Sequence, residues 1–183
     1  MDSRSLVLLV VALWATAARG QESPLPDACA SPPIPPGLLG NLADSYPGWT
    51  AVRLTDLEPD DRELWLKSSR ATQCPGVVSG RFVSAQTPAW AVVAVSGGSG
   101  NQRVMVLLGQ PGAKGRFSFR TALAPESAVR PAVVWALPPG EYRMADGRLV
   151  KTKLDSIVVE HIEAGALLLV WKQGRFDRLV YSQ

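Results

Sequence analysis

The chain has 183 residues, with 19 lysines and arginines against 16 aspartates and glutamates and a formal net charge of +3. This length accommodates one domain with its own hydrophobic core and leaves no room for two large ones. The positive charges are interspersed with negative ones, as in Asp60-Asp61-Arg62-Glu63, and form no basic block. Nucleic-acid-binding proteins gather their cations into a patch or stripe, so the sequence predicts that nucleic acid is not a partner.

The N-terminus has the layout of a cleavable export signal. An apolar run over 6–14 is followed by small residues, with Ala18 and Gly20 at the two positions that a signal peptidase requires to be small. The apolar run is too short to span a bilayer as a stable helix. We therefore predict that residues 1–20 are a signal peptide and that the mature chain begins at Gln21. The protein is expected to be periplasmic or secreted, without stable membrane insertion.

Residues 21–37 are predicted to form an extended, proline-rich leader. Proline lacks a backbone N–H and fixes φ, which excludes both a helix and a central strand in this segment. The prolines are Pro24, Pro26, Pro32, Pro33, Pro35 and Pro36.

The two cysteines, Cys29 and Cys74, are predicted to form a disulfide, because pairing is the rule in an exported protein. The bond would close a loop of about 45 residues, for which chain entropy gives an upper value of about 4 kcal/mol. Lipid attachment to Cys29 is disfavoured by the Pro26-Asp27-Ala28 that precedes it. Zinc binding would need more ligands than these cysteines and the single His161, so no metal is predicted.

One helix is predicted to begin near Pro59, with Thr55 or Asp56 as its N-cap, and segment 38–49 is a candidate for a second, shorter helix. Acidic residues in the first turn and cations in the last turn suit the helix dipole. The apolar stripe of this helix is expected to comprise Leu57, Leu64 and Trp65.

From Gly76 onward, short apolar and β-branched runs alternate with turns that contain glycine or proline. This pattern is typical of an antiparallel meander. The predicted fold is therefore mostly β (α+β), with about seven to nine strands and one or two N-terminal helices in a single domain over 38–183 with one core. The candidate strands are Val77–Val83, Trp90–Ser96, Arg103–Leu108, Arg116–Thr121, Ala132–Leu137, Leu149–Lys153, Ser156–His161, Ala166–Lys172 and Arg175–Ser182.

Two of these strands, Ala91–Val95 and Ala166–Val170, are apolar without interruption. Such a run indicates burial on both faces, so both are expected to be central strands. The last two strands are expected to form a hairpin across Lys172-Gln173-Gly174.

The segment 74–95 resembles a degenerate FG-GAP-type repeat, through Gly80, Phe82, Ala91 and Val92. In that family an aspartate-rich loop binds calcium, and several repeats build a β-propeller. Residues 83–87 stand where the loop would lie and contain no carboxylate. Calcium requires several hard oxygen donors, so the resemblance does not imply a calcium site here.

The wider layout is similar to a group of small, exported, uncharacterised bacterial proteins. The residues that carry this resemblance are Trp65, Cys74-Pro75-Gly76, Pro138-Pro139-Gly140-Glu141-Tyr142, Trp171 and Phe176. No activity is established for that group, so the resemblance implies export and a β-rich fold but no chemistry.

The sequence contains no recognisable catalytic constellation, and no catalytic residue, metal or cofactor is predicted. The glycine-rich stretch 97–100 is followed by neither Lys-Ser/Thr nor a helix, so it is predicted to be a hairpin loop and not a phosphate cradle. His161 lies between acidic residues, and an alternative hypothesis is a cell-envelope hydrolase that uses His161 with Asp155 or Glu160.

Aromatic and basic side chains gather near the last hairpin, and we predict that Trp171, Arg175 and Phe176 bind a partner there. Exposed aromatic rings beside arginine stack on sugars, bases or peptides. The leading hypothesis is a non-catalytic binding or accessory domain whose partner is another envelope or extracellular macromolecule.

Overall fold

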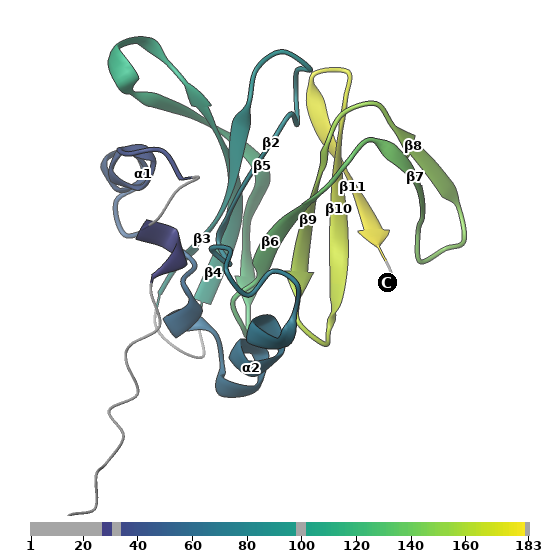
Figure 1. Ribbon diagram of the computed structural model, residues 1–183, viewed down its shortest axis with the longest axis horizontal. Helices are drawn as coiled ribbons and strands as arrows, with labels where there is room; N and C mark the ends of the chain where they lie inside the picture. Colours follow the sequence, from purple (N-terminus) through teal and green to yellow (C-terminus); the bar gives the residue numbers. More distant parts are fainter. Residues whose placement is uncertain (1–26, 31–33, 98–101, 182–183) are drawn as a thin grey trace, which may run out of the picture.

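The computed structural model describes residues 27–30, 34–97 and 102–181 as two antiparallel sheets packed face to face, with a separate two-stranded ribbon at one side (Figure 1). The predicted signal peptide and residues 21–26 and 31–33 of the proline-rich leader lie outside the described residues. The described part of the leader contains a short 3₁₀-helix, Ala28–Ala30, where an extended chain was predicted. The first sheet contains β1 (Thr50–Ala51), β2 (Val77–Gly80), β3 (Ala89–Ser96), β4 (Gln102–Pro111) and β5 (Phe117–Ala128). The second sheet contains β6 (Val133–Leu137), β9 (Ser156–His161), β10 (Gly165–Lys172) and β11 (Arg175–Tyr181), and the ribbon pairs β7 (Gly140–Arg143) with β8 (Leu149–Thr152).

The mostly β class and the antiparallel pairing are confirmed, with two α-helices, α1 (Leu38–Ser45) and α2 (Pro59–Lys67). The described residues contain 11 strands, where about seven to nine were predicted. The additional strands are β1, which has only two residues, and β7, which begins at the glycine of a Pro-Pro-Gly turn. The chain also leaves the first sheet after β5 and inserts the β7–β8 ribbon between β6 and β9, so it is not one continuous meander.

The hydrophobic interior consists of three clusters, where one core was predicted. The first lies between the two sheets, the second lies under α1 on the outer face of the first sheet, and the third lies between the second sheet and the β7–β8 ribbon. Successive residues of the central strands alternate between clusters: Val93 belongs to the first and Val92 to the second, while Leu169 belongs to the first and Leu168 to the third. Both predicted central strands are thus buried on both faces. Burial of the outer face requires a second layer, which α1 supplies for the first sheet and the β7–β8 ribbon for the second.

Helix α2 differs from the prediction at its start and in its buried stripe. Its N-cap is Glu58, because Pro59 forces the preceding residue into an extended conformation. The buried residues of the helix are Asp61 and Trp65, one turn apart, whereas Leu64 is 39% exposed. The Asp61 carboxylate accepts a hydrogen bond from the Arg130 guanidinium at 3.5 Å, which compensates in part for its burial.

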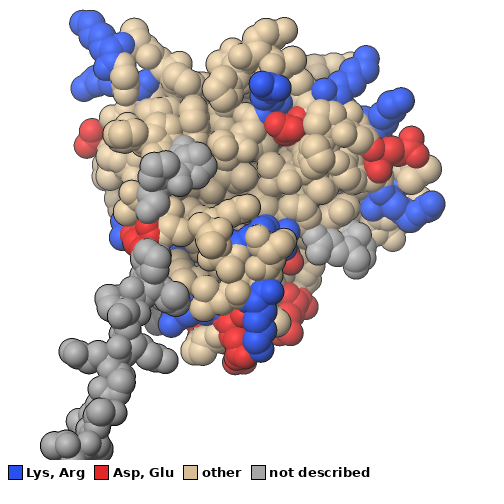
Figure 2. Space-filling model, viewed as in Figure 1, with Lys and Arg blue, Asp and Glu red and all other residues tan. Residues whose placement is uncertain are grey.

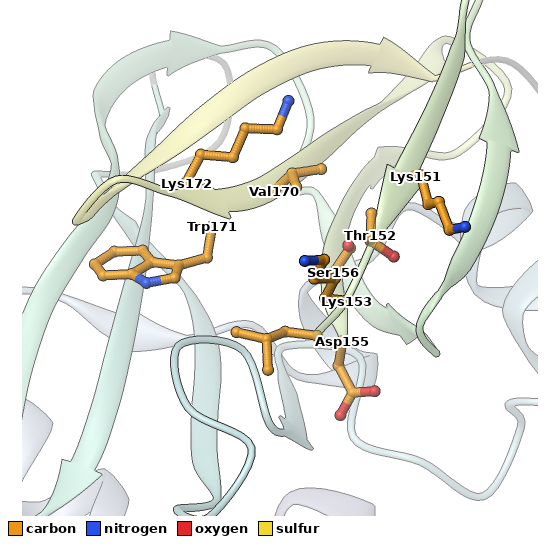
Figure 3. A pocket seen from close by; sticks show the side chains of 9 residues that line it. Lys151, Thr152, Lys153, Asp155, Ser156, Val170, Trp171 and Lys172 are labelled. Carbon is orange, nitrogen blue, oxygen red and sulfur yellow. The ribbon is translucent and has the colours of Figure 1, made fainter.

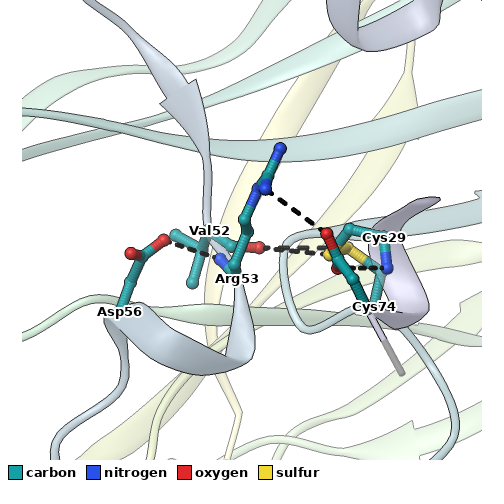
Figure 4. The surroundings of a disulfide bond; sticks show 6 residues. Cys29, Val52, Arg53, Asp56 and Cys74 are labelled. Atoms are coloured by element: carbon teal, nitrogen blue, oxygen red, sulfur yellow. Dashed lines mark hydrogen bonds and ion pairs between the residues drawn. A yellow bond between two sulfur atoms is a disulfide. The ribbon is translucent and has the colours of Figure 1, made fainter. Parts of the chain in front are cut away.

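The predicted disulfide between Cys29 and Cys74 is present, and the backbone of Val52 lies against it (Figure 4). The Val52 carbonyl oxygen is 3.7 Å from one sulfur and 3.9 Å from the other. A Cβ on Gly76 would lie 2.3 Å from the same oxygen, so only glycine permits this approach. The Cys74-Pro75-Gly76 sequence therefore combines a covalent bond with a close backbone contact.

A Gly-x-aromatic pattern recurs in two strands and has one physical explanation. The ring of Phe82 covers Gly80, where a Cβ would lie 2.6 Å from the ring, and Phe82 is fully buried. In β7 the ring of Tyr142 covers Gly140 in the same way. The aromatic ring fills the space that a strand glycine leaves empty.

We predict that Gly80→Ala lowers the free energy of unfolding by about 1–3 kcal/mol, because the new methyl group overlaps a ring that has no room to move. The matched control is Gly40→Ala in α1, where nothing lies within 4 Å of the added Cβ. That change is expected to raise stability by about 0.5–1 kcal/mol through helix propensity. Urea unfolding measures both, and an unchanged midpoint for Gly80→Ala contradicts the packing described.

We predict that the double variant Cys29→Ala, Cys74→Ala loses up to about 4 kcal/mol of stability, since the unfolded chain regains the entropy of a 45-residue loop. Chemical denaturation of the oxidised wild type, the reduced wild type and the double variant measures this loss. Reduction and the double substitution should shift the midpoint in the same direction. A double variant as stable as the oxidised protein refutes the stabilising role of the bond.

Candidate functional site

Several hairpin loops meet at one end of the molecule, and α2 lies at the opposite end (Figure 1). The loop after β2 (81–88), the β8–β9 connection (153–155) and the β10–β11 turn (173–174) all lie at this end, uppermost in the figure. The β4–β5 hairpin projects from the same end. We call this the hairpin end.

The hairpin end is rich in cations, although they are scattered in the sequence. Figure 2 shows blue side chains along its upper rim with some red side chains beside them, and red side chains mixed with blue ones over the lower part of the molecule. The cations of the hairpin-end loops and strand ends are Arg81, Lys114, Arg116, Lys153, Lys172 and Arg175. The sequence did not reveal this grouping, because each loop contributes only one or two charges and the fold brings the loops together.

The predicted binding residues Trp171, Arg175 and Phe176 lie on the β10–β11 hairpin. Trp171 and Phe176 are paired across the two strands, and their ring centroids are 5.0 Å apart. Both rings are half-buried, and the Arg120 guanidinium of β5 lies 5.2 Å from the Trp171 ring centroid. Arg175 is exposed and lies near Asp177, with a 3.8 Å ion pair. The hairpin therefore presents a supported aromatic pair beside an exposed arginine that is paired with Asp177.

A cavity of about 310 Å³ adjoins Trp171, and Figure 3 shows its lining side chains. It is formed because the pairing of β9 with β10 ends at Ile157 and Leu169, whereas β10 continues to Lys172. The gap between the two strands is bordered by the β8–β9 connection. The lining residues are Lys151, Thr152, Lys153, Leu154, Asp155, Ser156, Val170, Trp171 and Lys172.

The polar side chains of this cavity differ in whether they are already hydrogen-bonded. The Thr152 hydroxyl accepts a hydrogen bond from the Gly140 N–H at 3.2 Å, and the Asp155 carboxylate accepts one from the Arg81 N–H at 2.6 Å. The Ser156 hydroxyl is buried, with the residue only 1% exposed, and it has no hydrogen-bond partner among the residues that the structure describes. An unpaired buried hydroxyl costs about 1–3 kcal/mol.

A second cavity, of about 410 Å³, lies on the other side of the β8–β9 connection. It shares Lys153, Leu154 and Asp155 with the first and is otherwise lined by the loop after β2, including Arg81. The two cavities are therefore neighbours, and together they form a two-lobed depression across the hairpin end.

The residues of the alternative hydrolase site are not brought together in this structure. Asp155 and His161 lie at opposite ends of β9, about 20 Å apart at the rise of an extended strand. Glu160 accepts a hydrogen bond from the Trp135 indole at 2.8 Å and forms an ion pair of 3.7 Å with Arg70. The Arg70 guanidinium in turn stacks 4.3 Å from the Trp135 ring centroid, so Glu160 belongs to a packing network.

Comparison of the chain with protein-family models, with curated proteins and with solved structures gave no match. The resemblance of residues 74–95 to an FG-GAP-type repeat therefore stays a prediction. Across the described ranges, none of the helices combines the length and the apolar character needed to cross a bilayer.

Tyr142 lies in β7, and its hydroxyl donates a hydrogen bond to the Pro138 carbonyl. Burial, and to a smaller extent the charges of Tyr181 and Asp155, raises the pKa of the Tyr142 phenol above its ordinary value of 10.0. The neutral phenol therefore stabilises the folded state fully below pH 10, and this contribution is lost as the pH rises through the higher pKa of the folded state.

We predict that a tyrosinate absorbance titration of the folded protein contains a phase above pH 10 that Tyr142→Phe removes. Wild-type stability should also fall more steeply than that of Tyr142→Phe through this alkaline range. A substitution that removes only absorbance change centred at pH 10 contradicts the partly buried, hydrogen-bonded placement of Tyr142.

Proposed function

We propose that this chain is an exported, non-catalytic binding domain that attaches to an anionic envelope or extracellular macromolecule through its hairpin end. The disulfide supports export, because such bonds persist in oxidising compartments outside the cytosol. The observation that carries the proposal is the coincidence, at one end, of cations, the Trp171–Phe176 pair and two adjoining cavities.

Each of these features contributes a different part of the recognition. The cations attract a negatively charged partner from a distance and orient it. The supported aromatic pair offers a rigid surface on which a planar or sugar-like group can stack at low entropic cost. The two neighbouring cavities suit a partner long enough to place one chemical group in each of them, and a small molecule would occupy only one.

We predict that Arg175→Glu reduces retention of the mature protein on isolated envelope or extracellular polymers by about tenfold at low salt, through charge reversal at the binding surface. Arg175 forms no hydrogen bond that the fold depends on and its side chain is 79% exposed, so the variant should fold normally. Sedimentation with the polymer, at increasing salt concentrations, measures the retention.

The matched control is Arg148→Glu, which reverses an equally charged side chain, 61% exposed, in the β7–β8 turn. It should bind as the wild type does. Equal loss of retention in both variants would mean that net charge, and not the position of Arg175, determines binding. Absence of binding by the wild type, or catalytic turnover of the polymer, would refute the proposal.

A further inference from the structure

We propose that the cavity beside Trp171 is a subsite for a phosphate group, with Lys153 and Ser156 as its principal ligands. The inference rests on the proposed function, because it assigns a chemistry to the anionic partner: the partner bears phosphate. The cavity itself is defined by its lining residues and by the gap that opens beyond the last β9–β10 pair.

The first argument is the Ser156 hydroxyl. It lines the cavity, is buried, and has no hydrogen-bond partner among the described residues. Buried polar groups in folded proteins are almost always paired. A hydroxyl left unpaired inside a cavity is explained if a ligand supplies the missing partner, and an oxyanion is an acceptor for it.

The second argument is the charge around that hydroxyl. Lys151, Lys153 and Lys172 line the cavity together with one carboxylate, that of Asp155. Figure 3 shows that the ammonium groups of Lys151 and Lys172 extend outward and that Asp155 points away from Ser156. The Asp155 carboxylate is also engaged by the Arg81 N–H. Lys153 belongs to the short β8–β9 connection that leads into Ser156, whereas Lys172 forms a 3.7 Å ion pair with Asp177. The long, flexible side chain of a lysine can turn toward a bound anion.

The third argument is the backbone of β10. Residues 170–172 extend past the last pair with β9, so the main-chain groups on that side have no partner strand at the cavity. Backbone N–H groups are strong donors to oxyanions. A phosphate group carries close to two negative charges at neutral pH and offers three oxygens, which matches several lysines, a hydroxyl and a strand-end N–H group better than a carboxylate does.

The test is calorimetric titration of the mature protein at pH 7.5 with inorganic phosphate, glycerol phosphate and acetate. We expect both phosphates to bind and acetate to bind at least tenfold more weakly. Stronger binding of glycerol phosphate identifies an esterified phosphate, carried by a larger molecule, as the natural ligand, and stronger binding of inorganic phosphate identifies the free ion. Equal binding of acetate and phosphate, or no binding of phosphate, overturns the proposal.

Two variants assign the ligands. Lys153→Gln should weaken phosphate binding about tenfold, whereas Lys67→Gln, which removes an exposed lysine from α2, should have no effect. Ser156→Ala should weaken phosphate binding and, in the absence of phosphate, raise the melting temperature, because it removes an unpaired buried hydroxyl. A merely structural serine would give the opposite result: lower stability with unchanged phosphate binding.

These outcomes separate the subsite from the proposed function. Phosphate binding that depends on Lys153 and Ser156, in a protein that retains no envelope polymer, would refute the macromolecular partner and leave the subsite intact. Polymer retention that depends on Arg175 and is unaffected by Lys153→Gln, with no phosphate binding, would refute the subsite alone.

Discussion

The close contact between the backbones of Val52 and Gly76 is the constraint on which the rest of the fold depends. The Val52 N–H donates to the Val93 carbonyl, and the Val93 N–H donates to the Gly76 carbonyl, which fixes this crossing to the centre of the first sheet. Pro75, one residue earlier, accepts a hydrogen bond from Val134 in the second sheet. The disulfide lies directly over the Val52 carbonyl. One short segment therefore joins β1, β2, β3 and β6 and closes them with a covalent bond.

This junction accounts for the unequal ends of the molecule. The Val134–Pro75 hydrogen bond joins the two sheets beside the disulfide. At the hairpin end neighbouring strands end at different points, as β9 and β10 do. The unequal ends of β9 and β10 create the cavity at Ser156, and lysine side chains border it. The Arg120 guanidinium of β5 lies against the Trp171 ring of β10, which links the two sheets at this end. The polar depression thus results from the unequal strand ends.

The parts of the fold that could be predicted are those that a local sequence pattern indicates. The apolar runs around Val93 and Leu169 predicted central strands, and Gln173-Gly174 predicted the final hairpin, whose two loop residues both have positive φ. The cysteine pair was also predictable, because an exported chain with two cysteines has one default pairing. Each of these predictions depends on neighbouring residues or on the number of cysteines, and not on contacts between distant segments.

The remaining features depend on contacts between distant segments, so no local sequence pattern predicts them. Leu64 looked like a core residue, yet the side of α2 that faces the sheets carries Asp61, because Arg130 is placed opposite it. The predicted site residues Trp171, Arg175 and Phe176 do lie together, but the neighbouring Lys153 and Ser156 are conspicuous only once the early end of the β9–β10 pairing is known. Gly76 needed knowledge of Val52, 24 positions earlier, to be recognised as a contact point instead of a turn.

The most direct test of the proposal that the hairpin end is the binding surface is backbone hydrogen exchange of residues 21–183 with and without an isolated anionic envelope polymer. The account predicts slower exchange in 81–88, 153–156 and 171–176, with α2 unchanged. Protection centred on α2, or spread evenly over both ends, would contradict it.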